Sequence, residues 1–160
     1  MAIYMKLGDK IKGNVTAEGF KDQIELHSLQ WGVGRGISTP VGSSANREAS
    51  APSISEVTVS KELDNASAQL FTEATTGKAD QGLKCEITIV KTGDKLEEIA
   101  KFTLENTMIS GYSLSSGGDR PSESLSLNFT KVEYKVTPTQ PDGKAGDPVT
   151  SSFNLATGKA

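Results

Sequence analysis

The chain has 160 residues and a mass of 16.9 kDa, and its 17 Lys and Arg against 20 Asp and Glu give a net charge of −3. This length is typical of one domain, here residues 1–160, and the charge balance excludes a polycation that binds nucleic acid. The only cysteine is Cys85, which excludes an intrachain disulfide. The 18 serines, 15 threonines and 16 glycines indicate a mainly β protein with many turns.

The first residues of the chain, Met1 to Asp9, contain neither the basic segment nor the apolar segment of a signal peptide. No apolar run approaches the ~18 residues that a membrane-spanning helix requires. We therefore expect a chain that is made in the cytoplasm without a cleaved signal peptide and that does not insert stably into a membrane.

Alternating apolar and polar residues predict a series of strands. The clearest alternation lies at 83–90, where Cys85 belongs to the apolar side. Two predicted strands change the parity of their apolar residues, near His27 and at 130–131, and each change indicates a bulge or strong twist that curls a sheet. In chain order the predicted strands are 3–7, 24–31, 54–59, 83–90, 99–114, 125–136 and 153–155.

One helix is predicted over residues 64–76, with Asp64 as its N-cap and Gly77 after its end. Leu70 and Phe71 lie on the apolar face of this segment, so we expect both side chains to be buried against the sheet. A helix this short depends on that packing, because its intrinsic propensity alone would not keep it folded.

Residues 32–53 differ in composition from the rest of the chain, since 16 of these 22 residues are Gly, Ser, Ala, Pro, Thr or Asn. A structureless connection longer than ~12–15 residues is uncommon inside a compact domain. Val33, Ile37 and Val41 are apolar and spaced four apart. Two interpretations stay open: a mobile surface loop, or a segment that packs against something outside its own chain.

Candidate residues for catalysis or metal binding are few. A Ser-His-acid triad would have to use the only histidine, His27. One Cys and one His cannot form a structural zinc site, and the glycines at 32–36 are not followed by the helix start that a phosphate site needs. Cys85 is interpreted as a small buried apolar residue. The sequence therefore predicts no enzyme, no cofactor and no metal.

Three stretches resemble one known family when they are taken together and in this order. They are Ile3-Tyr4-Met5-Lys6-Leu7 continuing to Trp31-Gly32-Val33, then Lys61-Glu62-Leu63-Asp64-Asn65-Ala66-Ser67 with Leu70-Phe71, and Tyr112-Ser113 through Gly117-Gly118-Asp119-Arg120-Pro121 and Leu125-Ser126-Leu127-Asn128-Phe129 to Glu133-Tyr134. Over roughly residues 3–136 the chain is similar to the haemolysin-coregulated protein (Hcp) family of the type VI secretion system.

The resemblance implies a small β-barrel of two antiparallel sheets with one short α-helix and a long extended loop. It also implies homo-hexameric rings that stack into the inner tube of the secretion system. A contractile sheath surrounds this tube, a spike caps it, and small effector proteins travel in its lumen. The protein itself would leave a Gram-negative bacterium through the same apparatus.

Two groups of candidate contact residues follow from the resemblance. The long loop is expected to reach a neighbouring protomer or ring through Val33, Arg35, Ile37, Val41, Arg47 and Glu48. The second group is a turn formed by Ser115, Ser116, Gly117, Gly118, Asp119 and Arg120. It is either an ordinary turn, in which Asp119 pairs with Arg120 or a neighbour, or a close-packed part of a ring face or lumen wall.

Two other classes of function compete with a structural tube. A β-barrel that binds a sugar or another small molecule would need exposed aromatic side chains, but Trp31 is the only tryptophan and aromatic residues make up 6% of the chain. A small hydrolase would depend on His27, so replacing His27 with alanine separates it from a tube protein.

Overall fold

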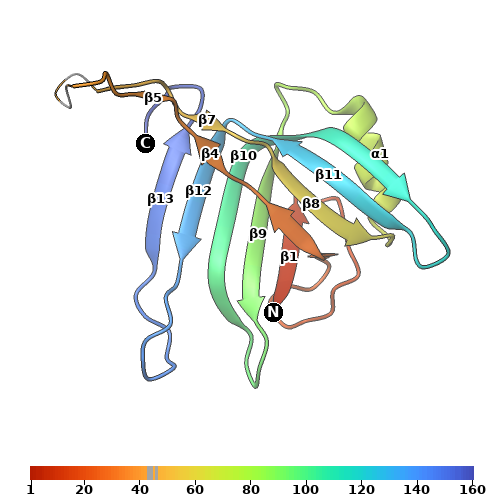
Figure 1. Ribbon diagram of the computed structural model, residues 1–160. Coiled ribbons are helices and arrows are strands. Elements are labelled where there is room, and N and C mark those ends of the chain that lie inside the picture. The colour runs from red at the N-terminus through yellow and green to blue at the C-terminus, as the bar shows by residue number, and fades with distance from the viewer. Residues whose placement is uncertain (43–44, 46) are drawn as a thin grey trace.

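A computed structural model describes residues 1–42, 45 and 47–160. The body consists of antiparallel strands and one helix, and a long arm extends away from it (Figure 1), which confirms a mainly β fold with one short helix and an extended loop. The elements are β1 (Ala2–Leu7), β2 (Ile24–Leu26), β3 (Ser28–Gln30), β4 (Val33–Gly34), β5 (Ile37–Ser38), β6 (Glu48–Ala49), β7 (Ser53–Ile54), β8 (Val57–Glu62), α1 (Ser67–Thr76), β9 (Leu83–Lys91), β10 (Glu97–Ser115), β11 (Ser122–Asn128), β12 (Lys131–Val136) and β13 (Val149–Asn154).

Strand β10 belongs to two sheets, because different parts of its 19 residues pair with different strands. The part around Phe102 pairs with β9 and β12, and the part around Tyr112 pairs with β11. Sheet A therefore contains β2, β1, β9, β10, β12 and β13, whereas sheet B contains β3, β8, β11 and the end of β10. The register of β10 shifts at 104–107 and at 109–111, as is usual where a strand bends between sheets.

Both parity changes in the sequence mark places where the chain crosses between the sheets. His27 separates β2, which pairs with β1, from β3, which pairs with β8. Residues 129–130 separate β11 and β12, which pair with different parts of β10. Each predicted bulge within one long strand is therefore a break between two strands. The apolar residues change parity because their strands face the core from opposite sheets.

The two sheets curl around one core without hydrogen-bonded closure. Strands β2 and β3 end the path of pairings, and within the described residues they pair with β1 and β8 but not with each other. Because β2 and β3 follow one another in the chain, residues 24–30 border both sheets. The expected barrel is thus present as two curled antiparallel sheets joined by the chain.

The core lies between the sheets and contains mostly aliphatic side chains. Those that are almost completely buried include Met5, Leu7, Ile24, Val57, Val59, Leu70, Ile87, Leu104, Leu125 and Leu127. Cys85 is buried among them, as predicted, and this burial raises the pKa of its thiol far above the ordinary value. A smaller cluster of Tyr4, Val15, Val90 and Phe20 packs the segment after β1 onto the outer face of sheet A.

Helix α1 starts at Ser67, three residues later than predicted, and Ala66 occupies the N-cap position. Asp64 still stabilises the start of the helix, because its Oδ1 accepts a hydrogen bond from the Ala66 N–H at 2.9 Å. Leu70 is fully buried, but Phe71 is 56% exposed, so the prediction that Phe71 packs in the core is wrong. Among the described helical residues, no helix has the length and apolar character needed to span a membrane.

Candidate assembly surfaces

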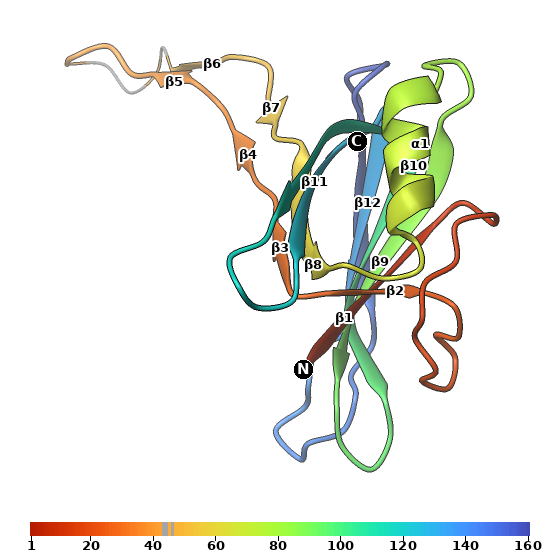
Figure 2. The same ribbon diagram turned by 90° about the vertical axis from the view of Figure 1, so that its right-hand side faces the viewer.

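The arm, residues 32–54, extends away from the body (Figure 2) and is held by backbone pairing and a few side-chain hydrogen bonds. Near the body, β4 pairs with β7, and further out β5 pairs with β6. Between the two ladders, the Ser50 N–H donates to the Gly36 carbonyl at 2.8 Å, and Arg35 Nε donates to the Ser50 carbonyl at 2.6 Å. In its described residues, the segment is thus a narrow two-stranded ribbon.

The candidate contact residues of the arm point into solvent. Val33, Ile37 and Val41 are exposed by 62%, 57% and 105%, and Arg47 and Glu48 are also exposed. Two-stranded ribbons without a packed face are at best marginally stable by themselves. An arm of this length with its apolar side chains uncovered is therefore suited to pack against another molecule.

An apolar groove lies at the base of the arm, and we call it the base groove. It encloses about 270 Å³ and is lined chiefly by Trp31, Val33, Ile54, Val132, Tyr134 and Phe153. The Tyr134 ring stacks on the Phe102 ring with centroids 4.8 Å apart, and the Trp31 ring lies 5.8 Å from Tyr134. Trp31 Nε1 is buried and has no hydrogen-bond partner within the described part of the chain.

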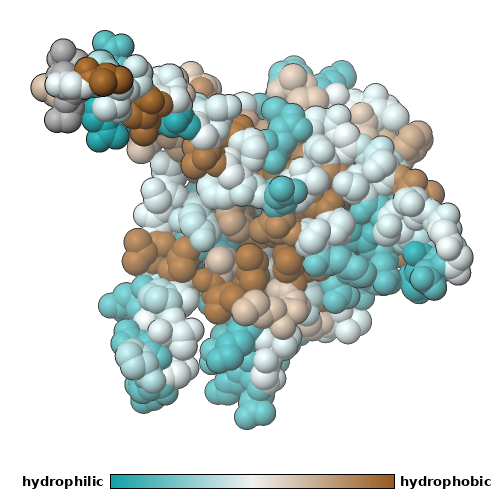
Figure 3. Space-filling view, in the orientation of Figure 1, coloured by the Kyte–Doolittle hydropathy of each residue, from teal (hydrophilic) through white to brown (hydrophobic). Residues whose placement is uncertain are grey.

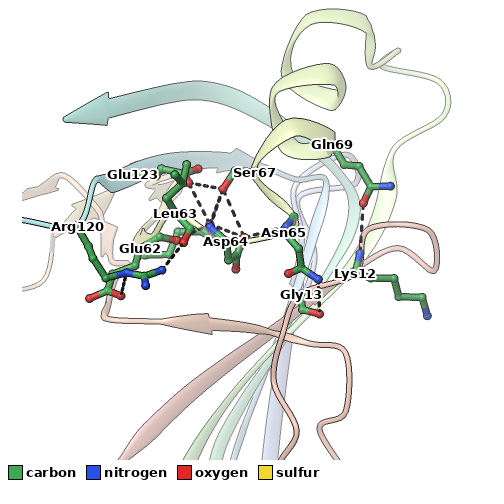
Figure 4. A network of polar contacts seen from close by, with 12 residues as sticks. Lys12, Gly13, Glu62, Leu63, Asp64, Asn65, Ser67, Gln69, Arg120 and Glu123 are labelled. Atoms are coloured by element: carbon green, nitrogen blue, oxygen red, sulfur yellow. Dashed lines mark hydrogen bonds and ion pairs between the residues drawn. The ribbon is translucent and has the colours of Figure 1, made fainter. Parts of the chain in front are cut away.

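A buried polar network joins the end of β8, the start of α1 and the start of β11 (Figure 4). Lys61 is fully buried, and its Nζ lies 3.0 Å from Asp64 Oδ1 and 3.3 Å from Glu123 Oε1. Ser67 Oγ donates a hydrogen bond to the same Glu123 oxygen, and the Asp64 N–H donates to Ser67 Oγ at 3.0 Å. The network therefore fixes α1 on sheet B.

This network was not predicted from the sequence, although a signal for it was present. Lys61 continues the buried parity of Val57 and Val59, and Glu123 continues that of Leu125. The two residues are direct cross-strand partners in the β11–β8 register. Opposite charges on core positions of neighbouring strands are costly unless they pair, so such positions predict a buried ion pair.

Residues 115–120 connect β10 and β11 as an exposed hairpin turn. Gly118 has a φ of +106°, a value that strongly favours glycine. Arg120 pairs with Glu62, with Nε 3.1 Å from Oε2, and it also donates to the Leu63 carbonyl at 3.1 Å. Among the described residues Arg120 thus contacts the end of β8, which ties the turn to that strand.

The solvent faces of the two sheets differ in charge. On sheet B, one row of cross-strand partners is Ser28, Ser60, Ser124 and Ser113, and the next row is Gln30, Thr58, Ser126 and Gly111. On sheet A, one row of cross-strand partners is Lys6, Glu86, Thr103, Glu133 and Ser152. The next row begins with Tyr4 and Thr88, which are buried, and continues with Lys101, Lys135 and Thr150. The central rows of sheet B thus consist of small, uncharged side chains with Glu62 in the row beside them, whereas the uncovered part of the outer face of sheet A is charged.

The described residues bring no catalytic set together around His27. Its Nε2 lies 3.7 Å from Glu62 Oε1 on the surface, and within this part of the chain its ring forms no hydrogen bond to a serine hydroxyl. No group of three or more His, Cys, Asp or Glu side chains among the described residues could hold a metal ion. A cleft of about 700 Å³ between the ends of β1 and α1 is lined by lysines, acidic residues and the aliphatic Leu7, Ile11 and Leu83, and its lining contains no aromatic side chain.

Comparisons with known proteins agree with the resemblance seen in the sequence. The family model for the type VI secretion system effector Hcp matches residues 4–136. Protein hcp1 of Pseudomonas aeruginosa is 27% identical over 157 residues, which cover 96% of this chain and 94% of that protein.

Solved structures share the complete fold. One that is described as a type six secretion system protein has a TM-score of 0.87 at 26% identity, and covers 99% of this chain and 98% of that chain. Hcp1 of Salmonella typhimurium has a TM-score of 0.79 at 21% identity, with coverage of 99% and 97%. Because the family model spans most of the sequence and the fold agrees throughout, the chain belongs to the Hcp family of structural, secreted type VI secretion proteins.

Proposed function

We propose that this chain forms homo-hexameric rings, and that these rings stack into the inner tube of a type VI secretion system. The tube carries small effector proteins in its lumen, lies inside a contractile sheath and ends at a spike. The chain is made in the cytoplasm of a Gram-negative bacterium and is exported with its cargo by the same apparatus.

The exposed arm is the observation that supports this proposal most strongly. It extends well beyond the body (Figure 2), and Val33, Ile37 and Val41 on it are exposed to solvent. Within the proposal, these residues contact the next ring, and Arg35, Arg47 and Glu48 pair with charges at its rim. Each contact is weak, but a ring of six repeats it, so the total affinity rises steeply with the number of arms.

The solvent face of sheet B is the lumen wall within this proposal. Its central rows of Ser, Thr, Gln and Gly carry no formal charge. Such a surface binds transported proteins weakly and discriminates little by charge, which suits a wall that must release its cargo. The 115–120 turn lies at the end of this face, where Arg120 and Glu62 form its charged border.

An arm-shortened variant tests the proposal. Replacing residues 36–51 by Asn-Gly joins residues 35 and 52, which face each other in the register of the β4–β7 ladder, and removes about the outer two thirds of the arm. Native mass spectrometry and negative-stain microscopy should show six-membered rings for both proteins but tubes only for the unaltered chain. As a matched control at full length, Ser38→Ala with Thr39→Ala should leave tubes intact, whereas Ile37→Ser with Val41→Ser should not. A chain that stays monomeric at all concentrations and salt levels contradicts the proposal.

A further inference from the structure

Helix α1 displays an apolar surface that its own chain does not cover. Phe71 is 56% exposed, and its ring forms an edge-to-face pair with the Tyr112 ring, with centroids 6.1 Å apart. Leu114 at the end of β10 and Leu63 before the helix are exposed by 54% and 39%. An aromatic side chain offers one of the largest apolar surfaces for burial, so an exposed Phe71 on a short helix is a candidate for contact with another molecule. We call Phe71, Leu63 and Leu114 the helix patch.

Strands β12 and β13 carry a second uncovered apolar surface. Tyr134 lies beside Phe102 in the β10–β12 register, and Val149 lies beside Val136 in the β12–β13 register. All four side chains are on the face of sheet A that forms the core elsewhere in the sheet. Sheet B does not reach this part of the face, so Tyr134 is 37% exposed and Val149 is 67% exposed. Apolar side chains gather over β12, β13 and the adjoining strands in the space-filling view (Figure 3). The base groove lies within this surface.

These two surfaces lie on opposite sides of the molecule. Figure 1 shows α1 at one side of the sheets and β13 at the other. A closed ring of identical chains needs a heterologous interface, in which two different and complementary surfaces of each copy meet. The helix patch offers a protruding aromatic side chain, and the base groove offers an apolar hollow of about 270 Å³. One chain thus supplies both halves of a contact that repeats around a ring.

The base groove also adjoins the arm, which is proposed above to contact the next ring in the tube. Val33 and Ile54, which line the groove, form the β4–β7 ladder at the root of the arm. A neighbour that fills the groove therefore also supports the root of the arm. This continuity favours a second copy of the chain as the occupant over an unrelated protein.

We propose that Phe71 of one copy inserts into the base groove of the next copy, and that this contact holds the ring together. The proposal rests on the hexameric assembly proposed above and names the surfaces that form it. It also explains why α1 buries Leu70 in its own core while the adjacent Phe71 stays exposed.

Introduced cysteines test this contact directly, because the native Cys85 is fully buried. Phe71→Cys combined with Ser151→Cys places one thiol on the helix patch and one in the base groove. Mild oxidation should link these copies into a ladder that ends at six on a denaturing gel. Gln69→Cys with Ser151→Cys is the matched control, because residue 69 lies on another side of the helix. This control and each single variant should give no ladder beyond dimers.

Substitution of Phe71 gives an independent measurement. Phe71→Ser should keep the fold and melting temperature of the isolated chain, since the side chain is mostly exposed. The concentration needed for ring formation should rise by roughly tenfold or more, as for other central aromatic residues of interfaces. Phe71→Leu should restore part of the loss.

The outcomes separate the two proposals. If the unaltered chain forms rings but Phe71→Ser forms them equally well and no ladder appears, the inference about Phe71 is wrong and hexameric assembly stands. If Phe71→Ser still forms rings but no longer binds a sheath protein, the helix patch contacts the sheath and not the next copy in the ring. If the unaltered chain forms no rings, the proposed function itself fails.

Discussion

The arm and the Lys61 network differ in how they hold their structure. The arm has hardly any buried side chain and is held by backbone ladders and a few exposed polar contacts. The network has three almost completely buried charged side chains, those of Lys61, Asp64 and Glu123. The contrast indicates a division of roles: the body is made rigid by its own contacts, whereas the arm can reach full stability only through contacts with other molecules.

The largest effect that tests this contrast is expected for Lys61→Met. The substitution leaves two carboxylates buried without their cation, which typically costs about 3–5 kcal/mol of unfolding free energy. Urea denaturation at low protein concentration measures this loss. Lys84→Met is the matched control, because Lys84 is mostly exposed and should change the free energy by less than about 0.5 kcal/mol. Equal effects of the two variants would show that the network adds nothing to rigidity.

Two adjacent residues of α1 test, within one helix, the same contrast between side chains held by the body and side chains left for other molecules. Leu70→Ala removes a fully buried side chain and should cost about 2–5 kcal/mol in the isolated chain. Phe71→Ala removes a side chain that is mostly in solvent and should cost less than about 1 kcal/mol there. Thermal unfolding of the monomer and of the ring distinguishes the two residues. A large loss for Phe71→Ala in the monomer would mean that the helix packs more deeply than described.

The sequence alone predicts most of the strands, because their apolar alternation reflects burial on one face. It predicts one helix and locates it within three residues. The sequence-based prediction that Phe71 is buried is wrong, because the sequence pattern of an apolar helix residue is the same whether it contacts its own core or a neighbouring chain. The parity changes at His27 and at 130–131 are visible in the sequence, but their cause is not, because a bulge and a sheet crossing shift the pattern alike.

The candidate site is harder to predict than the fold, for physical reasons. The composition of 32–53 excludes a core of its own but does not specify a ribbon, because the β4–β7 and β5–β6 ladders are backbone contacts that many sequences allow. The Lys61 and Glu123 pair was predictable from its core parity and opposite charges. The base groove was not, because it depends on how far sheet B extends across sheet A.

A smaller effect is expected at the surface beside the network. Arg120 reaches Glu62 and the Leu63 carbonyl, but its side chain is 69% exposed. Arg120→Ala should therefore lower the unfolding free energy by only about 0.2–1 kcal/mol, and this difference should shrink in high salt. Urea denaturation at two salt concentrations checks both statements. A salt-independent loss as large as that of Lys61→Met would mean that the turn belongs to the rigid body.

The smallest expected effect is an alkaline one at Tyr112, which lies between the helix patch and the network. Partial burial, and then the nearby Glu123 side chain, raise the pKa of Tyr112 to about 12 from its ordinary value of 10. Because the folded state holds the phenolic proton more tightly, this group's contribution to stability is complete below pH 10 and is lost as the pH rises through 12. The urea midpoint of the unaltered chain should thus fall further between pH 8 and pH 11 than that of Tyr112→Phe, which has no phenolic proton to lose. If both proteins weaken equally between these pH values, neither burial nor Glu123 holds the phenolic proton of Tyr112 in the folded state.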